Sequence, residues 1–197
     1  MKKQSDSNFS RGFTLIELVV VLALFLLIMG VAVSIFISIV QHQKSILSRQ
    51  EMLNQTSYVQ DTFSRRLRTA VVDSSGSCLV DGNVHYQGGV YLLTHFDLGS
   101  GFYQGVKFLA ADGACQEFFL GGDGVLKESK NGALPQALLS QKFTIVYARF
   151  IINADKNLRG ARPDGQVQPR ITFALSVQDA TQKNTAPLVV QTTISQR

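Results

Sequence analysis

The sequence has little that would support catalysis, redox chemistry or metal binding. No G-x-S-x-G, H-E-x-x-H or P-loop pattern occurs in its 197 residues, and Gly99-Ser100-Gly101 lacks the third glycine of a dinucleotide-binding motif. The 2 cysteines do not form a C-x-x-C pair, and His42, His85 and His95 have no ligand spacing. These absences argue against an enzyme, a cofactor and a metal centre.

Charge is also scarce. Only 17% of the residues are charged, and the net charge of +5 comes from 19 basic and 14 acidic side chains. Lys2, Lys3 and Arg11 against Asp6 place +2 of this charge in the first twelve positions, which leaves +3 for the other 185 residues. A charge so small and so scattered does not favour nucleic acid as a partner.

One long apolar block stands out between Phe13 and Val40. Glu17 is its only ionisable side chain, a composition that excludes a disordered chain and an ordinary cytosolic domain. As a helix, the block would be about 42 Å long at a rise of ~1.5 Å per residue, enough to cross a hydrocarbon core of ~30 Å once. Two alternatives fit less well: a buried core helix, which rarely runs so long without a polar face, and a secretory signal cut near Ala32-Val33-Ser34, whose apolar region would be shorter.

The basic residues around this block predict its orientation in a membrane. Lys2, Lys3 and Arg11 lie on the N-terminal side, while Lys44 and Arg49 follow the block on the other side. This bias favours an N-terminus in the cytoplasm. The rest of the chain is then expected outside the cytoplasm as an exported domain.

Glu17 is the unusual residue of the block, because a carboxylate inside a membrane span costs ~2.5 to 3.5 kcal/mol on insertion scales. The block contains no cation that could pair with it. Either Glu17 lies at the membrane edge and reaches the headgroups, or it has a functional partner elsewhere.

The string from Arg11 to Glu17, R-G-F-T-L-I-E, followed by the apolar run, resembles the class III signal of type IV prepilins and pseudopilins. The resemblance implies that prepilin peptidase cuts between Gly12 and Phe13 on the cytoplasmic side and methylates Phe13. It also implies that the apolar helix stays on the mature protein, with Glu17 as its fifth residue. Glycine suits the cleavage position, because a backbone without a side chain can approach the peptidase closely.

The resemblance further implies a role for Glu17 and a set of partners. In the family, this glutamate is thought to pair with the N-terminal amine of a neighbouring subunit, which would make a carboxylate in the membrane tolerable. The implied partners are the prepilin peptidase, other pilins or pseudopilins, an inner-membrane assembly platform and membrane lipid. The implied location is the cytoplasmic membrane as a single-pass protein, and then a periplasmic or cell-surface filament.

The stretch from Val59 to Val71 looks like the end of the stem helix in J-type minor pseudopilins of type II secretion and in some minor pilins. It departs from the usual pattern, which has an acid where this chain has Arg65 and Arg66. Other readings remain open: a DNA-uptake or adhesion minor pilin that binds ligand through its head, or a stand-alone anchored domain. The basic residues that the ligand-binding reading would use are Lys156, Arg159, Arg162 and Arg170.

The expected fold is α+β and pilin-like, with a long stem helix packed on an antiparallel β-sheet head. Apolar residues recur at helical intervals after the membrane block, and a helix stop is expected at Asp73 to Gly76. Alternating patterns then predict strands at 89–95, 104–110, 115–120, 124–128, 143–152, 171–178 and 188–194. The expected parts are a leader at 1–12, a transmembrane half-helix at 13–40, an amphipathic half-helix at 41–72 and an exported head at 73–197.

Two further sites are expected in the head. Cys78 and Cys115 are an even pair in an oxidising compartment, which favours one disulfide over two reduced thiols. Asp155, Asn157 and Asp164 lie in a long loop at 153–169 and could bind calcium, although three oxygen ligands are too few alone and solvated turn residues are the better interpretation.

Overall fold

The computed structural model describes residues 12–153, 169–181 and 186–196. The chain divides into two compact units, Met1–Leu47 and Ser48–Arg197. One helix, α1 (Leu15–Arg68), continues from the first unit into the second. The first unit consists of the N-terminal part of α1 and the segment before it, and the second contains every strand.

The first unit begins with a capped helix end. The backbone N–H of Thr14 donates to Glu17 Oε2 (3.1 Å), and the backbone N–H of Glu17 donates to Thr14 Oγ1 (3.3 Å). This reciprocal pair is a capping box, and it explains why the helix begins at Leu15 rather than at Phe13 as predicted. Residues 12–39 are all exposed in the single chain. Their length and apolar composition meet the requirements for a membrane span.

In the second unit, α1 is amphipathic and packs on the sheet. Its buried residues lie three or four positions apart on one face of the helix; they are Ser48, Met52, Thr56, Val59, Phe63 and Leu67. The helix ends at Arg68, four residues before the expected Val72. Val71 instead joins the sheet, because its N–H donates to the carbonyl of Leu109 (2.9 Å).

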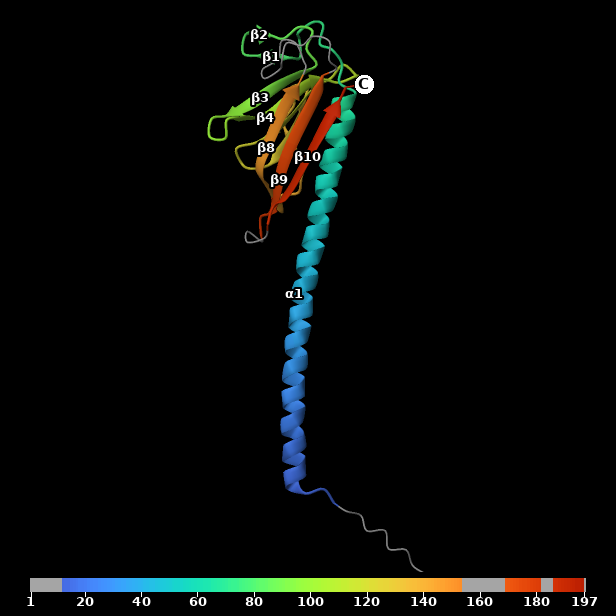
Figure 1. Ribbon diagram of the computed structural model, residues 1–197, viewed down its shortest axis with the longest axis vertical. Helices are drawn as coiled ribbons and strands as arrows, with labels where there is room; N and C mark the ends of the chain where they lie inside the picture. The colour runs from blue at the N-terminus through green and yellow to red at the C-terminus, as the bar shows by residue number, and fades with distance from the viewer. Residues whose placement is uncertain (1–11, 154–168, 182–185, 197) are drawn as a thin grey trace, which may run out of the picture. The chain divides into compact units, whose positions relative to one another are not determined.

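The head is built from one large antiparallel sheet and a small hairpin. The large sheet has eight strands in the order β10-β9-β8-β4-β5-β6-β7, and β3 pairs with β4 beside this path. Figure 1 shows β8, β9 and β10 side by side, with β10 next to α1. The strands are β1 (Val80–Asp81), β2 (Val84–His85), β3 (Tyr91–Asp97), β4 (Phe102–Leu109), β5 (Cys115–Leu120), β6 (Leu126–Lys130), β7 (Gln136–Ala137), β8 (Phe143–Asn153), β9 (Arg170–Asp179) and β10 (Leu188–Ser195).

The core lies between the sheet and the buried face of α1. Phe63 of the helix stacks on Phe118 of β5 with ring centroids 4.2 Å apart, and it meets Phe173 edge-on at 5.2 Å. Phe150 of β8 lies 6.0 Å from the same ring. One helical aromatic therefore joins three strands, and the expected α+β fold with a helix on an antiparallel sheet is confirmed.

The sequence patterns located most of the sheet but not the helix stop. All seven predicted strands are present, with ends displaced by up to two residues; they correspond to β3, β4, β5, β6, β8, β9 and β10. The two-residue strands β1, β2 and β7 were not predicted. Gly76 was expected near the helix end but lies eight residues beyond it, at φ +66°. A Cβ there would lie 2.6 Å from Gln87 Cγ, so this turn accommodates only glycine without a shift.

Candidate functional site

Gly12 and Phe13 lie in exposed backbone just before α1. Apart from its neighbours along the chain, no atom of the described residues lies within 4 Å of the position that a Gly12 Cβ would take, and Phe13 is 86% exposed. Both residues are outside the helical hydrogen-bond pattern, which begins with the Leu18 N–H bonded to the Thr14 carbonyl. A protease that needs extended backbone could therefore reach this bond in the single chain. The leader residues before position 12 lie outside the described residues.

The Glu17 carboxylate has a partner within its own chain. Its Oε2 accepts hydrogen bonds from the backbone N–H and the hydroxyl of Thr14, both at 3.1 Å. It also borders a hollow whose other walls are apolar, lined by Phe13, Leu18, Val21 and Leu22. The capping box was available as a sequence signal, T-x-x-E before an apolar run, but it was not used in predicting the role of Glu17. No cation of the described residues forms an ion pair with Glu17.

Cys78 and Cys115 form a disulfide across 37 residues of sequence, with Cα atoms 5.3 Å apart. The bond joins the loop before β1 to the first residue of β5. Cys115 is also held by Asn131, whose side-chain oxygen accepts the Cys115 N–H (2.8 Å). The disulfide therefore links the loop that follows the stem to the large sheet.

Asp73 organises the loop that carries Cys78. Its Oδ2 accepts the N–H groups of Cys78 and Leu79, each at 2.8 Å, and its Oδ1 accepts from Ser75 and Ser77. Burial acts to raise the pKa of this carboxyl, but these hydrogen bonds outweigh burial and hold the pKa below its usual value. The local pattern predicted only a helix stop and a turn here, and the role of the Asp73 carboxylate at the centre of the loop was missed.

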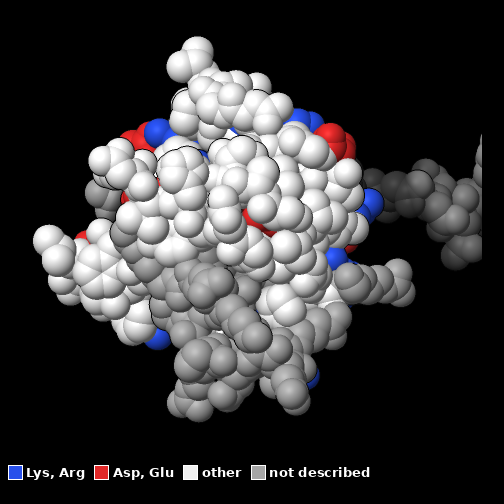
Figure 2. All heavy atoms as spheres, turned by 90° about the horizontal axis from the view of Figure 1, so that it is seen from above, with Lys and Arg blue, Asp and Glu red and all other residues white. Residues whose placement is uncertain are grey.

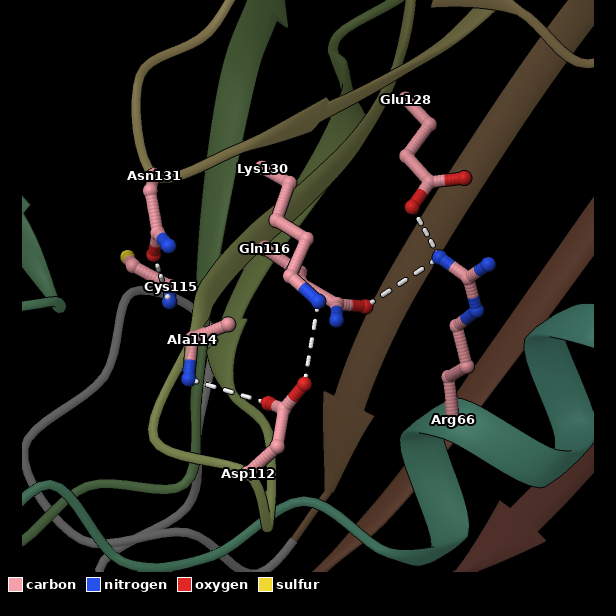
Figure 3. A network of polar contacts seen from close by, with 8 residues as sticks. All are labelled: Arg66, Asp112, Ala114, Cys115, Gln116, Glu128, Lys130 and Asn131. Carbon is pink, nitrogen blue, oxygen red and sulfur yellow. Dashed lines mark hydrogen bonds and ion pairs between the residues drawn. The ribbon is translucent and has the colours of Figure 1, made fainter.

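Arg66 is a second residue whose role sequence reasoning missed. Its guanidinium bonds to Glu128 of β6 and to Gln116 of β5 (3.3 Å), as Figure 3 shows. It also lies 5.8 Å from the Phe118 ring centroid. Arg65, by contrast, pairs with Asp61 on the exposed face of the stem. The two arginines that depart from the J-type pattern therefore serve different contacts, and only Arg66 binds α1 to the sheet.

A polar cluster joins the stem to β8 and β9 at the start of the second unit. The Ser48 hydroxyl donates to Asp179, which also accepts from the Thr181 N–H (2.8 Å) and hydroxyl (2.6 Å). The hydrogen bond from Ser48, followed by those from Thr181, lowers the pKa of Asp179 to about 2. Lys142 pairs with Glu51 nearby. This cluster holds the helix where it enters the head.

The remaining acids of the strand and turn regions have structural partners. Asp112 pairs with Lys130 (3.0 Å), which lowers the pKa of the Asp112 carboxyl. Burial acts to raise the pKa of Glu117, but hydrogen bonds from His95 and Thr94 lower it below its usual value. His95 Nε2 lies 3.2 Å from Glu117 Oε1. Among residues 12–153, 169–181 and 186–196, no three His, Cys, Asp or Glu side chains are placed to hold a metal ion.

The candidate ligand-binding loop lies almost entirely outside the described residues. This applies to the three calcium candidates, Asp155, Asn157 and Asp164, and to the basic residues Lys156, Arg159 and Arg162. Arg170, the fourth basic residue, is exposed at the first position of β9. Figure 2, seen from above, shows Lys and Arg interspersed with Asp and Glu around the described surface rather than gathered on it.

Comparisons with known proteins match the N-terminal segment. Residues 7–33 match the family model described as the prokaryotic N-terminal methylation motif. No curated protein and no solved structure matches the chain. The matched segment covers the class III signal and most of the apolar block. The motif, followed by the apolar helix and the antiparallel β-sheet head, supports the resemblance of the chain to the type IV pilin and pseudopilin family.

Proposed function

We propose that the chain is a minor pilin or pseudopilin that is cut and N-methylated by prepilin peptidase. It is then built into a type II secretion pseudopilus or a type IV pilus-like filament. The observation that carries the proposal is the N-terminal methylation motif, followed directly by an apolar helix with one carboxylate. The assignment as minor rests on the resemblance of the stem at 59–71 and on the size of the second unit, Ser48–Arg197.

The peptidase cuts between Gly12 and Phe13 and methylates the new N-terminus at Phe13. Support comes from the exposure of both residues and from their place before the first helical turn. Cleavage leaves a cation on Phe13, directly before Thr14 of the capping box. The N-terminus lies in the cytoplasm before cleavage, and the head lies outside.

Glu17 sets the position of each subunit in the filament by pairing with the cleaved amine of a neighbour. In the single chain, its carboxylate accepts hydrogen bonds only from Thr14 among the described residues. A carboxylate satisfied by neutral donors still lacks a compensating charge in lipid, and a neighbour's amine supplies one. The same residue therefore favours the assembled state over the solitary membrane state.

The processing step is tested by the intact mass and N-terminal sequence of membrane-extracted protein made with and without a prepilin peptidase. We expect loss of residues 1–12 and a methylated Phe13 only when the peptidase is present. An uncut chain, or a cut near Ser34, would contradict the proposal and favour an anchored or secreted domain.

The assembly step is tested with Glu17 variants that separate charge from helix capping. Glu17→Leu and Glu17→Gln should both be cleaved but should reduce filament incorporation by about tenfold or more, because each removes the carboxylate charge. Thr14→Ala is the matched control, since it removes the hydroxyl of the capping box and keeps Glu17. Incorporation of Glu17→Leu at the parental level would contradict the pairing role. A stand-alone anchored domain would function without the filament, and Glu17→Leu would then leave its activity intact.

The ligand-binding alternative has its own test. Replacing Lys156, Arg159, Arg162 and Arg170 together by Gln removes the basic character on which DNA or adhesin binding would depend. A filament subunit without that activity should assemble normally and leave DNA uptake and adhesion unchanged. A selective loss of either activity, with assembly intact, would favour the alternative.

A further inference from the structure

A charged hollow lies on the face of the sheet that points away from α1. The strand register places Arg149 of β8, Ala174 of β9 and Gln191 of β10 in one row, and Ile151 and Thr172 in the next. Their neighbours along the strands, such as Phe150 and Phe173, face the core. The five residues line a cavity of about 140 Å³. The small side chain of Ala174 at the middle of the row leaves room between Arg149 and Gln191.

Among the described residues, Arg149 is the only charged side chain that lines this hollow, and none of the described acids forms an ion pair with it. Its guanidinium lies over the Phe102 ring, with Cζ 3.3 Å from the centroid. Its Nε is buried and has no hydrogen-bond partner in the part of the chain that the structure describes. None of the ion pairs there involves Arg149. A buried N–H of a cation without an acceptor is unfavourable, so an arriving acceptor would be bound strongly.

The next row on the same face strengthens the case for a contact surface. Tyr147, Ser176 and Val189 form this row, and Ser176 carries the second buried side-chain atom without a partner among the described residues. The apolar side chains in and beside the hollow are accessible: Ile151, which lines it, is 38% exposed, and Val189 of the next row is 56% exposed. Arginine and tyrosine within an accessible apolar surround are the composition typical of binding hot spots.

We propose that this hollow is a carboxylate-binding socket that receives an Asp or Glu side chain from another protein subunit of the filament. The inference rests on the proposed function, since it takes the partner to be a co-assembled subunit. A guanidinium with one face on an aromatic ring keeps its in-plane N–H groups for a bidentate carboxylate. The Gln191 amide lines the same hollow and adds a donor. The apolar surround extends beyond one carboxylate, which favours a protein segment over a small free acid.

The test uses full-length protein in cells that build the filament, with the photocrosslinker p-benzoylphenylalanine in place of Val189. We expect the protein with the photocrosslinker at position 189 and an intact Arg149 to form an adduct with another protein subunit. Adding Arg149→Met should reduce the amount of this adduct by about tenfold or more. Arg170→Met is the matched control, because it removes a cation from the same sheet outside the hollow. Non-reducing electrophoresis, which reports the disulfide, verifies that each variant folds.

The adduct itself decides the chemistry of the partner. Mass spectrometry should find a crosslinked segment that contains Asp or Glu, and neutralising that acid should reduce the adduct as Arg149→Met does. Arg149→Glu combined with the acid changed to Arg should restore it. An adduct of parental intensity in Arg149→Met, a segment without an acid, or no adduct at all would overturn the proposal. A further contradicting result would be an Arg149 Nε–H resonance that shifts when sodium acetate is added to the purified protein while no adduct forms in cells. The hollow would then bind a small free acid rather than a protein segment.

Failure of the socket and failure of the proposed function give different results. If Glu17→Leu fails to assemble while Arg149→Met crosslinks like the parent, the socket is wrong and the filament role stands. If Glu17→Leu changes neither incorporation nor the Arg149-dependent adduct, the pairing role of Glu17 is wrong and the socket stands.

Discussion

At the scale of single residues, two carboxylates organise the head by accepting several hydrogen bonds each. Asp73 is fully buried and accepts from four donors in the loop before β1. Asp179 is also buried and accepts from α1 and from the turn after β9. Hydrogen bonds from many donors to a charged acceptor stabilise the ionised form, so each residue links the fold to pH.

Asp73→Asn should lower the free energy of unfolding by ~2 kcal/mol, because an amide cannot accept all of these bonds and leaves buried N–H groups unpaired. Chemical denaturation in detergent or of the soluble head would measure the change. Asp61→Asn, on the exposed face of the stem, is the control and should change stability by less than ~0.5 kcal/mol. Equal effects at the two positions would contradict the role given to Asp73.

Asp179 should make the head less stable in acid. Its pKa is about 2 in the folded head, against an ordinary value of 3.8. The unfolded chain therefore takes up the proton first, and the stabilisation is complete above about pH 5 and is lost as pH falls through about 4 toward 2. Unfolding followed from pH 7 to pH 2 should show this loss. Asp179→Asn should flatten that part of the profile, and an unchanged profile would refute the assignment.

At the scale of elements, polar contacts hold the last turns of the stem on the sheet in addition to the aromatic core. Arg66 of α1 bonds to residues of β5 and β6, as Figure 3 shows. At the end of the helix, the Tyr91 hydroxyl donates to the Leu67 carbonyl (2.5 Å) and the Gln196 amide donates to the Ala70 carbonyl (2.8 Å). These side chains satisfy carbonyls that a helix end leaves free. The disulfide fixes the segment that follows.

Removal of the disulfide should destabilise the head strongly. Replacing Cys78 and Cys115 together by Ala opens a loop of 37 residues, which corresponds to a loss of roughly 4 kcal/mol on the chain-entropy model. The comparison of parent, reduced parent and double variant by denaturant unfolding tests this. The reduced parent and the double variant should agree closely. No difference between oxidised and reduced parent would mean that the bond does not stabilise the head.

At the scale of the whole molecule, the two compact units differ in whether their apolar side chains are exposed or buried. The first exposes apolar side chains along residues 12–39, and the second encloses the described hydrophobic core. Exposed apolar surface of this extent requires lipid or neighbouring stems. The second unit needs neither in order to bury its core.

A fragment from Ser48 to Arg197 should therefore fold as a soluble domain without detergent. Circular dichroism should show sheet with some helix, and non-reducing electrophoresis should show the Cys78–Cys115 bond after export to an oxidising compartment. Phe63→Ala in the same fragment should cost ~3 to 5 kcal/mol, since the ring contacts three strands. Aggregation of the parent fragment would show that the apolar half of the helix is needed for folding.

The sequence by itself determined the features that depend on local pattern. The string from Arg11 to Glu17 identified the class III signal, and an apolar run of helical length predicted a span. Alternation predicted strands such as β9, where Ile171, Phe173 and Leu175 are buried as expected. Such patterns repeat within a few residues, so neighbours along the chain are enough to reveal them.

Only the tertiary structure decided which distant groups meet. The helix ends at Arg68 because Val71 pairs with Leu109, and Arg66 reaches Glu128 across 62 positions of sequence. The hollow at Arg149 forms where the register of three strands brings a small residue between two polar ones. Hydrogen bonds and cavities of this kind depend on chain segments that are remote in sequence, and a single sequence carries no local signal for such contacts.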